Sequence, residues 1–130
     1  MEKTLILLKP DTVQRGLIGK VISKIEEKGL KLVGLKMIRL EDTVLDEHYS
    51  HLTEKPFYPN IVKFMKSTPV VALCVEGADS VNQIRRLVGV TDCNKADMGT
   101  IRGDHGNSVS SNLIHASDTV ENAENEVKRF

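Results

Sequence analysis

Residues 112–121 read Asn-Leu-Ile-His-Ala-Ser-Asp-Thr-Val-Glu, and the rest of the chain is organised around them. The short apolar run over residues 113–116 predicts a buried strand, because such runs are typical of strands inside a sheet. The hydroxyl and carboxyl side chains that follow are typical of a helix start. This stretch would therefore deliver His115 to the mouth of a helix, where a histidine is either a packed core residue or a nucleophile.

Apolar runs and helical periodicity extend this pattern through the chain. The runs predict three more strands, over residues 5–8, 31–40 and 70–75. Apolar residues three and four apart, with cap and stop signals, predict helices over residues 17–28, 44–52, 59–65, 80–88 and 119–127. Asp118 and Glu121 have the spacing of a capping box at the last of these helices.

Residues 89–111 have no periodicity and few large apolar side chains. A loop of this length in a compact domain is usually functional or disordered. Strands separated by helices predict an α+β, ferredoxin-like (split βαβ) fold. We expect a four-stranded antiparallel sheet with helices packed on one of its faces and this long loop before the last strand. The 130 residues suit a single domain over residues 1–130.

Charge and cysteine content exclude some classes of partner. The chain has 18 Lys and Arg, 18 Asp and Glu and a formal net charge of zero, so nothing global points to nucleic acid or a membrane surface. Its apolar N-terminal run is too short for a signal peptide or a membrane span. Cys74 and Cys93 cannot form a disulfide framework, so we expect a reduced, cytoplasmic setting.

Glu126 gives His115 a candidate partner. It lies on the predicted last helix, from which a carboxylate could reach back and orient the imidazole. A histidine with an orienting carboxylate is the general form of an activated nucleophile. The alternative is that Glu126 is a solvated surface residue and that Ser117 and Asp118 only cap the helix.

A second candidate motif lies in the long loop. Residues 99–104 read Gly-Thr-Ile-Arg-Gly-Asp, and the glycines that flank Arg102 would let an anion approach closely. Arg85 and Thr91 are nearby in sequence, which adds to the pattern of a phosphate clamp, although Arg-Gly-Asp also occurs in ordinary turns. No Walker A or GxGxxG pattern and no zinc-ligand spacing is present, so a phosphate site here would be neither a P-loop nor a Rossmann site.

These motifs, together with Lys9-Pro10-Asp11 near the start, resemble the nucleoside diphosphate kinase family over essentially the whole chain. The resemblance implies a ping-pong phosphotransfer. A nucleoside triphosphate, usually ATP with Mg²⁺, would phosphorylate His115, and another nucleoside diphosphate would then receive the phosphate. Lys9 would lie at the end of a strand, where side chains meet ligand or solvent. The alternative interpretation is an ordinary exposed lysine without a role in binding.

The resemblance also implies roles for the side chains around the nucleophile. Ser117 would support Glu126, which would orient the imidazole of His115. The phosphates would be contacted by Lys9, Tyr49, Arg85, Thr91 and Arg102.

The remaining roles concern the sugar, the base and the metal. Asn112 and Lys9 would bind the sugar hydroxyls, and the base would lie between Phe57 and Val109. Asp118 would help to hold the Mg²⁺ shell through water.

Four positions depart from the family pattern. Cys93 and Met98 stand where prolines are common, in a loop that packs between subunits of hexameric members, and His105 replaces an aromatic residue. Ala116 replaces the glycine after the histidine. The resemblance implies a homo-oligomer, either a dimer, a tetramer or a hexamer. A hexamer is the first expectation, and a tetramer is the second because the altered loop weakens the usual hexamer contact.

A catalytically silent nucleotide- or nucleic-acid-binding module on the same fold is the alternative function, because a fold does not determine function. A mere binding module has no need of an oriented nucleophile, so the complete polar set favours an active enzyme.

Overall fold

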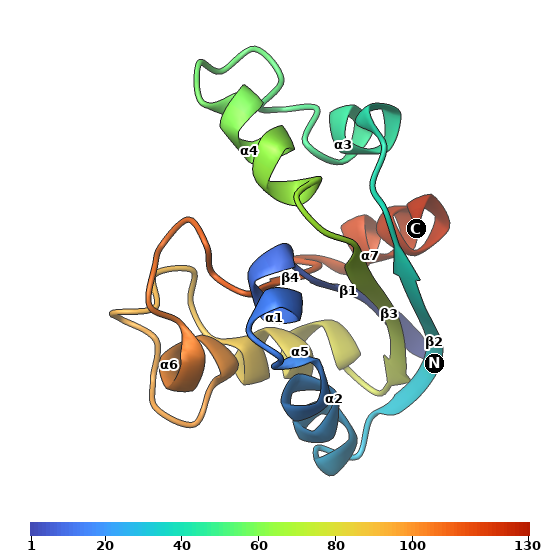
Figure 1. Cartoon of the computed structure of the whole chain (residues 1–130). Coiled ribbons are helices and arrows are strands. Elements are labelled where there is room, and N and C mark those ends of the chain that lie inside the picture. Colours follow the sequence, from blue (N-terminus) through green and yellow to red (C-terminus); the bar gives the residue numbers. More distant parts are fainter.

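Four strands form one antiparallel sheet at the centre of the computed structural model, which describes all of residues 1–130 (Figure 1). They are β1 (Glu2–Leu8), β2 (Lys31–Ile38), β3 (Val70–Gly77) and β4 (Ile114–Ala116). The strand order is β2-β3-β1-β4, so β1 and β3 are central and β2 and β4 are the edges. The predicted ferredoxin-like sheet is confirmed.

Seven helices accompany the sheet. They are α1 (Pro10–Gln14), α2 (Ile18–Glu27), α3 (Asp42–His48), α4 (Tyr58–Met65), α5 (Ser80–Val88), α6 (Ile101–His105) and α7 (Val120–Arg129). Two of them, α1 and α6, were not predicted. Pro10 ends β1 but also suits the first position of a helix. In α6 the Thr100 side chain accepts a hydrogen bond from the Gly103 amide, so the predicted loop contains a capped helix.

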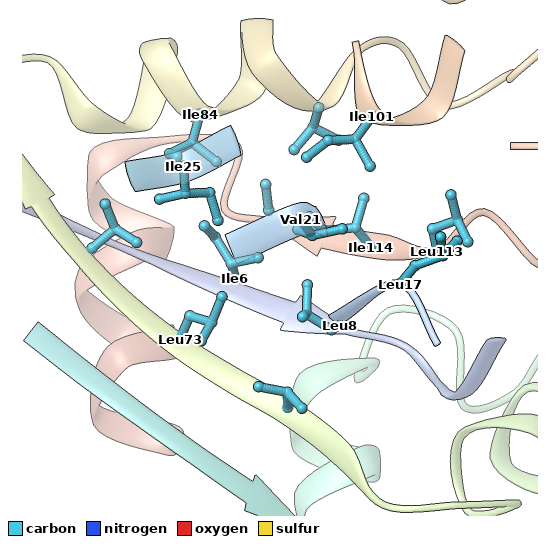
Figure 2. Close-up of a cluster of buried hydrophobic side chains, with 14 of the residues drawn as sticks. Ile6, Leu8, Leu17, Val21, Ile25, Leu73, Ile84, Ile101, Leu113 and Ile114 are labelled. Carbon is cyan, nitrogen blue, oxygen red and sulfur yellow. The ribbon is translucent and has the colours of Figure 1, made fainter. Parts of the chain in front are cut away.

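Helices cover both faces of the sheet, and the prediction of a single covered face is wrong. Ile6 and Leu73 lie in the main core, opposite Ile25 of α2 and Ile84 of α5 (Figure 2). A smaller core contains alternate residues of β1 together with Phe130, which directly follows α7. Because β1 is apolar on both faces, each face needs a cover, and α7 lies on the side away from α2 and α5.

The start of α7 also differs from the prediction. Thr119 is the N-cap, and its side chain accepts a hydrogen bond from the Asn122 amide at 3.1 Å. Asp118 instead accepts from the Asn122 side chain at 2.7 Å, so the expected capping box with Glu121 does not form.

The register of β4 sets the direction of His115. This residue pairs with Leu7 of β1, while Ile114 and Ala116 on either side belong to the main core. Because successive side chains in a strand point to opposite faces, His115 faces the α7 side of the sheet. The strand begins one residue later than predicted, because Leu113 has a φ of 74° and is not extended.

No helix in the chain has the length and apolar content needed to cross a bilayer. The edge strand β2 pairs only with β3, and Val33, Leu35 and Met37 along it are exposed.

Candidate active site

His115 and Glu126 are hydrogen-bonded, as the sequence predicted. His115 Nε2 lies 2.8 Å from Glu126 Oε1, which reaches back from α7. Ser117 is fully buried and donates its hydroxyl to the same carboxylate oxygen at 2.7 Å. The Ser117 hydroxyl oxygen also accepts a hydrogen bond from the Leu5 amide, which ties Ser117 to the central strand β1. With its Nε2–H directed at a carboxylate, the imidazole keeps the lone pair of Nδ1 free.

Two opposing influences act on the Glu126 carboxyl group. Burial raises its pKa, but the hydrogen bond and charge of His115 and the Ser117 hydroxyl together outweigh burial and hold the pKa below its usual value. Tyr49 lies close by, and burial together with the charge of Glu126 raises the pKa of its phenol to about 12. The site thus contains an ionised carboxylate and a neutral phenol near neutral pH.

A second histidine, which the sequence did not identify as part of the site, packs against the first. The rings of His48 and His115 meet edge to face, with centroids 4.7 Å apart. Burial, followed by the charge of His115, lowers the pKa of His48 to about 3. Arg129 lies 3.0 Å from His48 Nδ1, to which it donates. The sequence pattern placed His48 on the apolar face of a helix, where a packing role was the simplest interpretation. Arg129 lies three residues after Glu126 on α7, so helical spacing could have predicted that both side chains face the site.

Lys9 lies beside Asn112, as expected from their shared role. Its Nζ donates to the Asn112 side-chain oxygen at 2.8 Å. Burial, and then the nearby charge of Arg102, lower the pKa of Lys9 to about 8, although the Asp11 carboxylate works in the opposite direction. The ammonium group therefore carries a proton near neutral pH but holds it weakly.

Arg102 has a larger structural role than the sequence suggested. Its guanidinium donates to the backbone carbonyls of Gly89 at 3.1 Å, Asn112 at 3.3 Å and Ile114 at 2.6 Å. It thereby joins α6 to the end of α5 and to β4. A guanidinium has five N–H donors, so some remain for an anion. Burial lowers the pKa of Arg102, with a further contribution from the charge of Arg85.

Two cavities collect most of the predicted site residues. One, of about 460 Å³, is lined by His115, Glu126, Tyr49, Arg85, Thr91, Arg102 and Asp118, and also by His48 and Arg129. The other, of about 600 Å³, is lined by Lys9, Tyr49 and Phe57 with residues of α4 and with Ser110 and Ser111. Tyr49 borders both cavities. Val109 is half exposed and does not line the second cavity, although the next two residues do.

Residues of α1 hold the backbone just before β4. Leu113 is fully buried at a φ of 74°, a conformation that costs a branched side chain on the order of 1–3 kcal/mol. The Asp11 carboxylate accepts the Leu113 amide at 2.9 Å, and the Thr12 hydroxyl donates to the Leu113 carbonyl. Asp11 belongs to a motif quoted above, but nothing in the sequence indicated this contact.

Cations gathered around an oriented imidazole suit the handling of phosphoryl groups, because phosphoryl transfer depends on positioning and charge neutralisation. The fold and the site together therefore define a phosphotransferase.

Comparison with known proteins gives the family. A family model described as nucleoside diphosphate kinase matches residues 2–130. A nucleoside diphosphate kinase of Parabacteroides distasonis is 53% identical over 130 residues, which cover 100% of this chain and 85% of the relative. The chain therefore belongs to the nucleoside diphosphate kinase family.

Solved structures agree with this membership. Nucleoside diphosphate kinase from Encephalitozoon cuniculi is 46% identical with a TM-score of 0.96, over 100% of this chain and 88% of that one. The enzyme from Halobacterium salinarum, in complex with CDP, is 46% identical with a TM-score of 0.94, over 99% of this chain and 86% of that one.

Proposed function

We propose that this protein transfers the γ-phosphate of a nucleoside triphosphate, usually ATP, to a nucleoside diphosphate through a phosphohistidine on His115. The observation that carries the proposal is the array of His115, Glu126 and Ser117, in which one part-buried carboxylate oxygen accepts from both neighbours at 2.8 and 2.7 Å. A module that only bound nucleotides would have no use for this array.

The reaction consists of two displacements at phosphorus. The Nδ1 lone pair of His115 attacks the γ-phosphorus, the bond to the bridging oxygen breaks, and the nucleoside diphosphate leaves with the electron pair. A terminal phosphate oxygen of a second nucleoside diphosphate then attacks the same phosphorus and releases the imidazole. Glu126 keeps the proton on Nε2 throughout, so Nδ1 remains the nucleophile in both directions.

The cations around the first cavity would neutralise the phosphates. Arg85 and Arg102 line it, Thr91 adds a hydroxyl that can donate to a phosphate oxygen, and Tyr49 offers a protonated phenol at the border with the second cavity. Lys9 lines the second cavity beside Asn112, so the two are suited to the sugar hydroxyls and the adjoining phosphate.

The second cavity suits a base that is held by its faces. Phe57 lines it, half exposed, with its ring free to stack. Val109 would lie on the other face of the base, as the family resemblance implies. Stacking is available to every base, so we expect weak base preference. The CDP bound by the Halobacterium salinarum relative supports a nucleotide as the ligand.

Mg²⁺ fits the residues present. Asp118 is exposed at the first cavity and uses only one carboxylate oxygen, toward Asn122. Mg²⁺ in such sites keeps several waters and is held by one or two carboxylates together with substrate phosphates. When bound, it would neutralise phosphate charge, and Asp118 would hold its shell through water.

We also propose a cytoplasmic homo-oligomer, a hexamer or a tetramer. Free thiols at both cysteines support a reducing setting. The exposed apolar row of Val33, Leu35 and Met37 on the unpaired edge of β2 supports self-association, because such edges are usually covered. Light scattering should give the mass of one of these assemblies, and a monomer would contradict the proposal.

Labelling tests the central step. Protein incubated with γ-labelled ATP should acquire a label that is labile in acid and stable in alkali, as phosphohistidine is. His115→Ala should remain unlabelled while keeping the fold. Absence of label in the wild type, or label in the variant, would refute the mechanism.

A further inference from the structure

The peptide units around Leu113 are held by α1 from two sides. Asp11 Oδ2 accepts the Leu113 amide at 2.9 Å, while the Thr12 hydroxyl and the Lys9 amide, the latter at 2.9 Å, donate to the Leu113 carbonyl. Leu113 itself is fully buried and has the left-handed φ of 74° that favours glycine. A bulky residue stays in this conformation only where its surroundings fix it.

We propose that Asp11 is a positioning residue for phosphoryl transfer: its carboxylate holds Leu113 in the left-handed conformation and so aims Asn112 and His115 into the site. The inference rests on the function proposed above and adds a residue to which that function assigns no role. It concerns the direction of backbone and side chains, and Asp11 itself does not touch the reacting atoms.

The position of Leu113 in the chain explains why its conformation matters. The residue before it, Asn112, accepts the Lys9 ammonium at 2.8 Å. Two residues after it, His115 sits in a register with Leu7 that directs it to Glu126. A change from left-handed to extended backbone at Leu113 would rotate these two side chains relative to each other.

Other contacts cannot replace Asp11. Arg102 binds the carbonyls on either side of Leu113, those of Asn112 and Ile114, but it leaves the Leu113 amide alone. That amide is held by Asp11 alone. The Asp11 carboxylate is nine-tenths buried, and its Oδ1 has no hydrogen-bond partner. Burial of such a group costs free energy, and the hydrogen bond from the Leu113 amide to Oδ2 offsets part of that cost.

Two substitutions of Asp11 separate geometry from charge. Asp11→Asn removes the charge but keeps an oxygen that can accept the amide. Asp11→Glu keeps the charge but displaces the carboxylate by one methylene. Positioning requires that the asparagine variant phosphorylate His115 at essentially the wild-type rate in a single turnover at saturating ATP, at a pH well below the pKa of Lys9, where this lysine stays charged without the help of Asp11. The glutamate variant should be slower by on the order of 10- to 100-fold, as expected for misplaced reacting groups.

Glu2→Ala is the matched control. Glu2 also accepts a backbone amide across elements, that of Val81 at 2.8 Å, but at the far end of β1. It should unfold more readily than the wild type and yet keep the rate of phosphorylation. A fast glutamate variant with a slow asparagine variant would show that charge matters and geometry does not, and would overturn the proposal. Equal rate losses in the Asp11→Glu and Glu2→Ala variants would do the same.

Backbone scalar couplings and carbon chemical shifts of Leu113 provide a readout without catalysis. In Asp11→Glu they should move away from left-handed values, and in Asp11→Asn they should not. Unchanged values in Asp11→Glu would refute the proposal even if its rate fell. If the wild type took no label on His115, the proposed function would fail, whereas the couplings would still report whether Asp11 holds Leu113.

Discussion

Replacement of Glu126 by glutamine tests the electrostatic part of the site most directly. The amide oxygen of glutamine can still accept from His115 Nε2 and from Ser117, which lie at 2.8 and 2.7 Å in the wild type. Geometry and tautomer are therefore kept while the negative charge is lost. The side chain is only 12% exposed, so solvent screens the charge weakly.

The magnitude follows from the two kinds of hydrogen bond. A bond to a charged group contributes about 1.5–3 kcal/mol and a neutral one about 0.5–1.5 kcal/mol. Because attack by the imidazole on phosphorus develops positive charge on the ring, the transition state should lose about 1–2 kcal/mol of stabilisation in Glu126→Gln. Each 1.36 kcal/mol is tenfold in rate, so phosphorylation should slow by roughly 5- to 30-fold.

The assay is single-turnover labelling with γ-labelled ATP, quenched in alkali, with bound label counted over time. Glu124→Gln is the control, because Glu124 lies exposed on the same helix and its variant loses the same charge. Glu126→Ala should be slower than Glu126→Gln, because alanine has no oxygen to hold the imidazole proton of His115 on Nε2. A wild-type rate in Glu126→Gln, or equal losses in Glu126→Gln and Glu124→Gln, would refute the reasoning.

Three further outcomes are expected. Phe57→Ala should weaken nucleotide binding by about 1–3 kcal/mol in calorimetry, and unchanged affinity in a folded variant would contradict base stacking. The kcat/KM of the wild type should fall as pH rises through about 8, where Lys9 loses its proton, and this fall should be absent in Lys9→Arg, whose side chain stays charged; a flat wild-type profile would be the contrary result. Because the folded pKa of His48 is about 3 and its ordinary value 6.5, the unfolded chain takes up a proton first as pH falls below 6.5, so the free energy of unfolding should drop by up to about 1.4 kcal/mol per pH unit. In urea titrations at pH 7 and 5.5, His48→Gln should lack this part of the loss, and equal losses in both proteins would contradict it.

Local sequence patterns predicted a helix or strand correctly where the residues at its ends are typical of one structure. They failed where a residue is typical of two structures. Pro10 ends a strand and also opens a helix, and only the first reading was made. Asp118 and Thr119 are both good caps at adjacent positions, and local preference cannot choose between them. The apolar row of β1 predicted a buried strand but not that α7 would cover its second face.

The site was predictable where its residues share one segment. Glu126 follows His115 closely enough for helix geometry to suggest the pair, and the hydrogen bond is present. His48 and Asp11 reach the site from distant parts of the chain, and such contacts depend on how the sheet brings elements together. Val109, which the family resemblance placed against the base opposite Phe57, does not line the cavity that contains Phe57.

The pairing of His115 with Leu7 limits how the length of this chain can vary. Insertion of one residue between Leu113 and Ile114 would exchange the two sides of β4, so that the imidazole would take the place of Ala116 in the main core and Ile114 would take the place of His115 near Glu126. Insertions within residues 89–100 or 106–110 shift no strand pairing. We therefore expect that random insertion libraries selected for phosphotransfer will accept changes in length in these loops away from Gly89, Thr91, Thr100 and Val109, and will reject every one-residue insertion or deletion from Asn112 to Ser117.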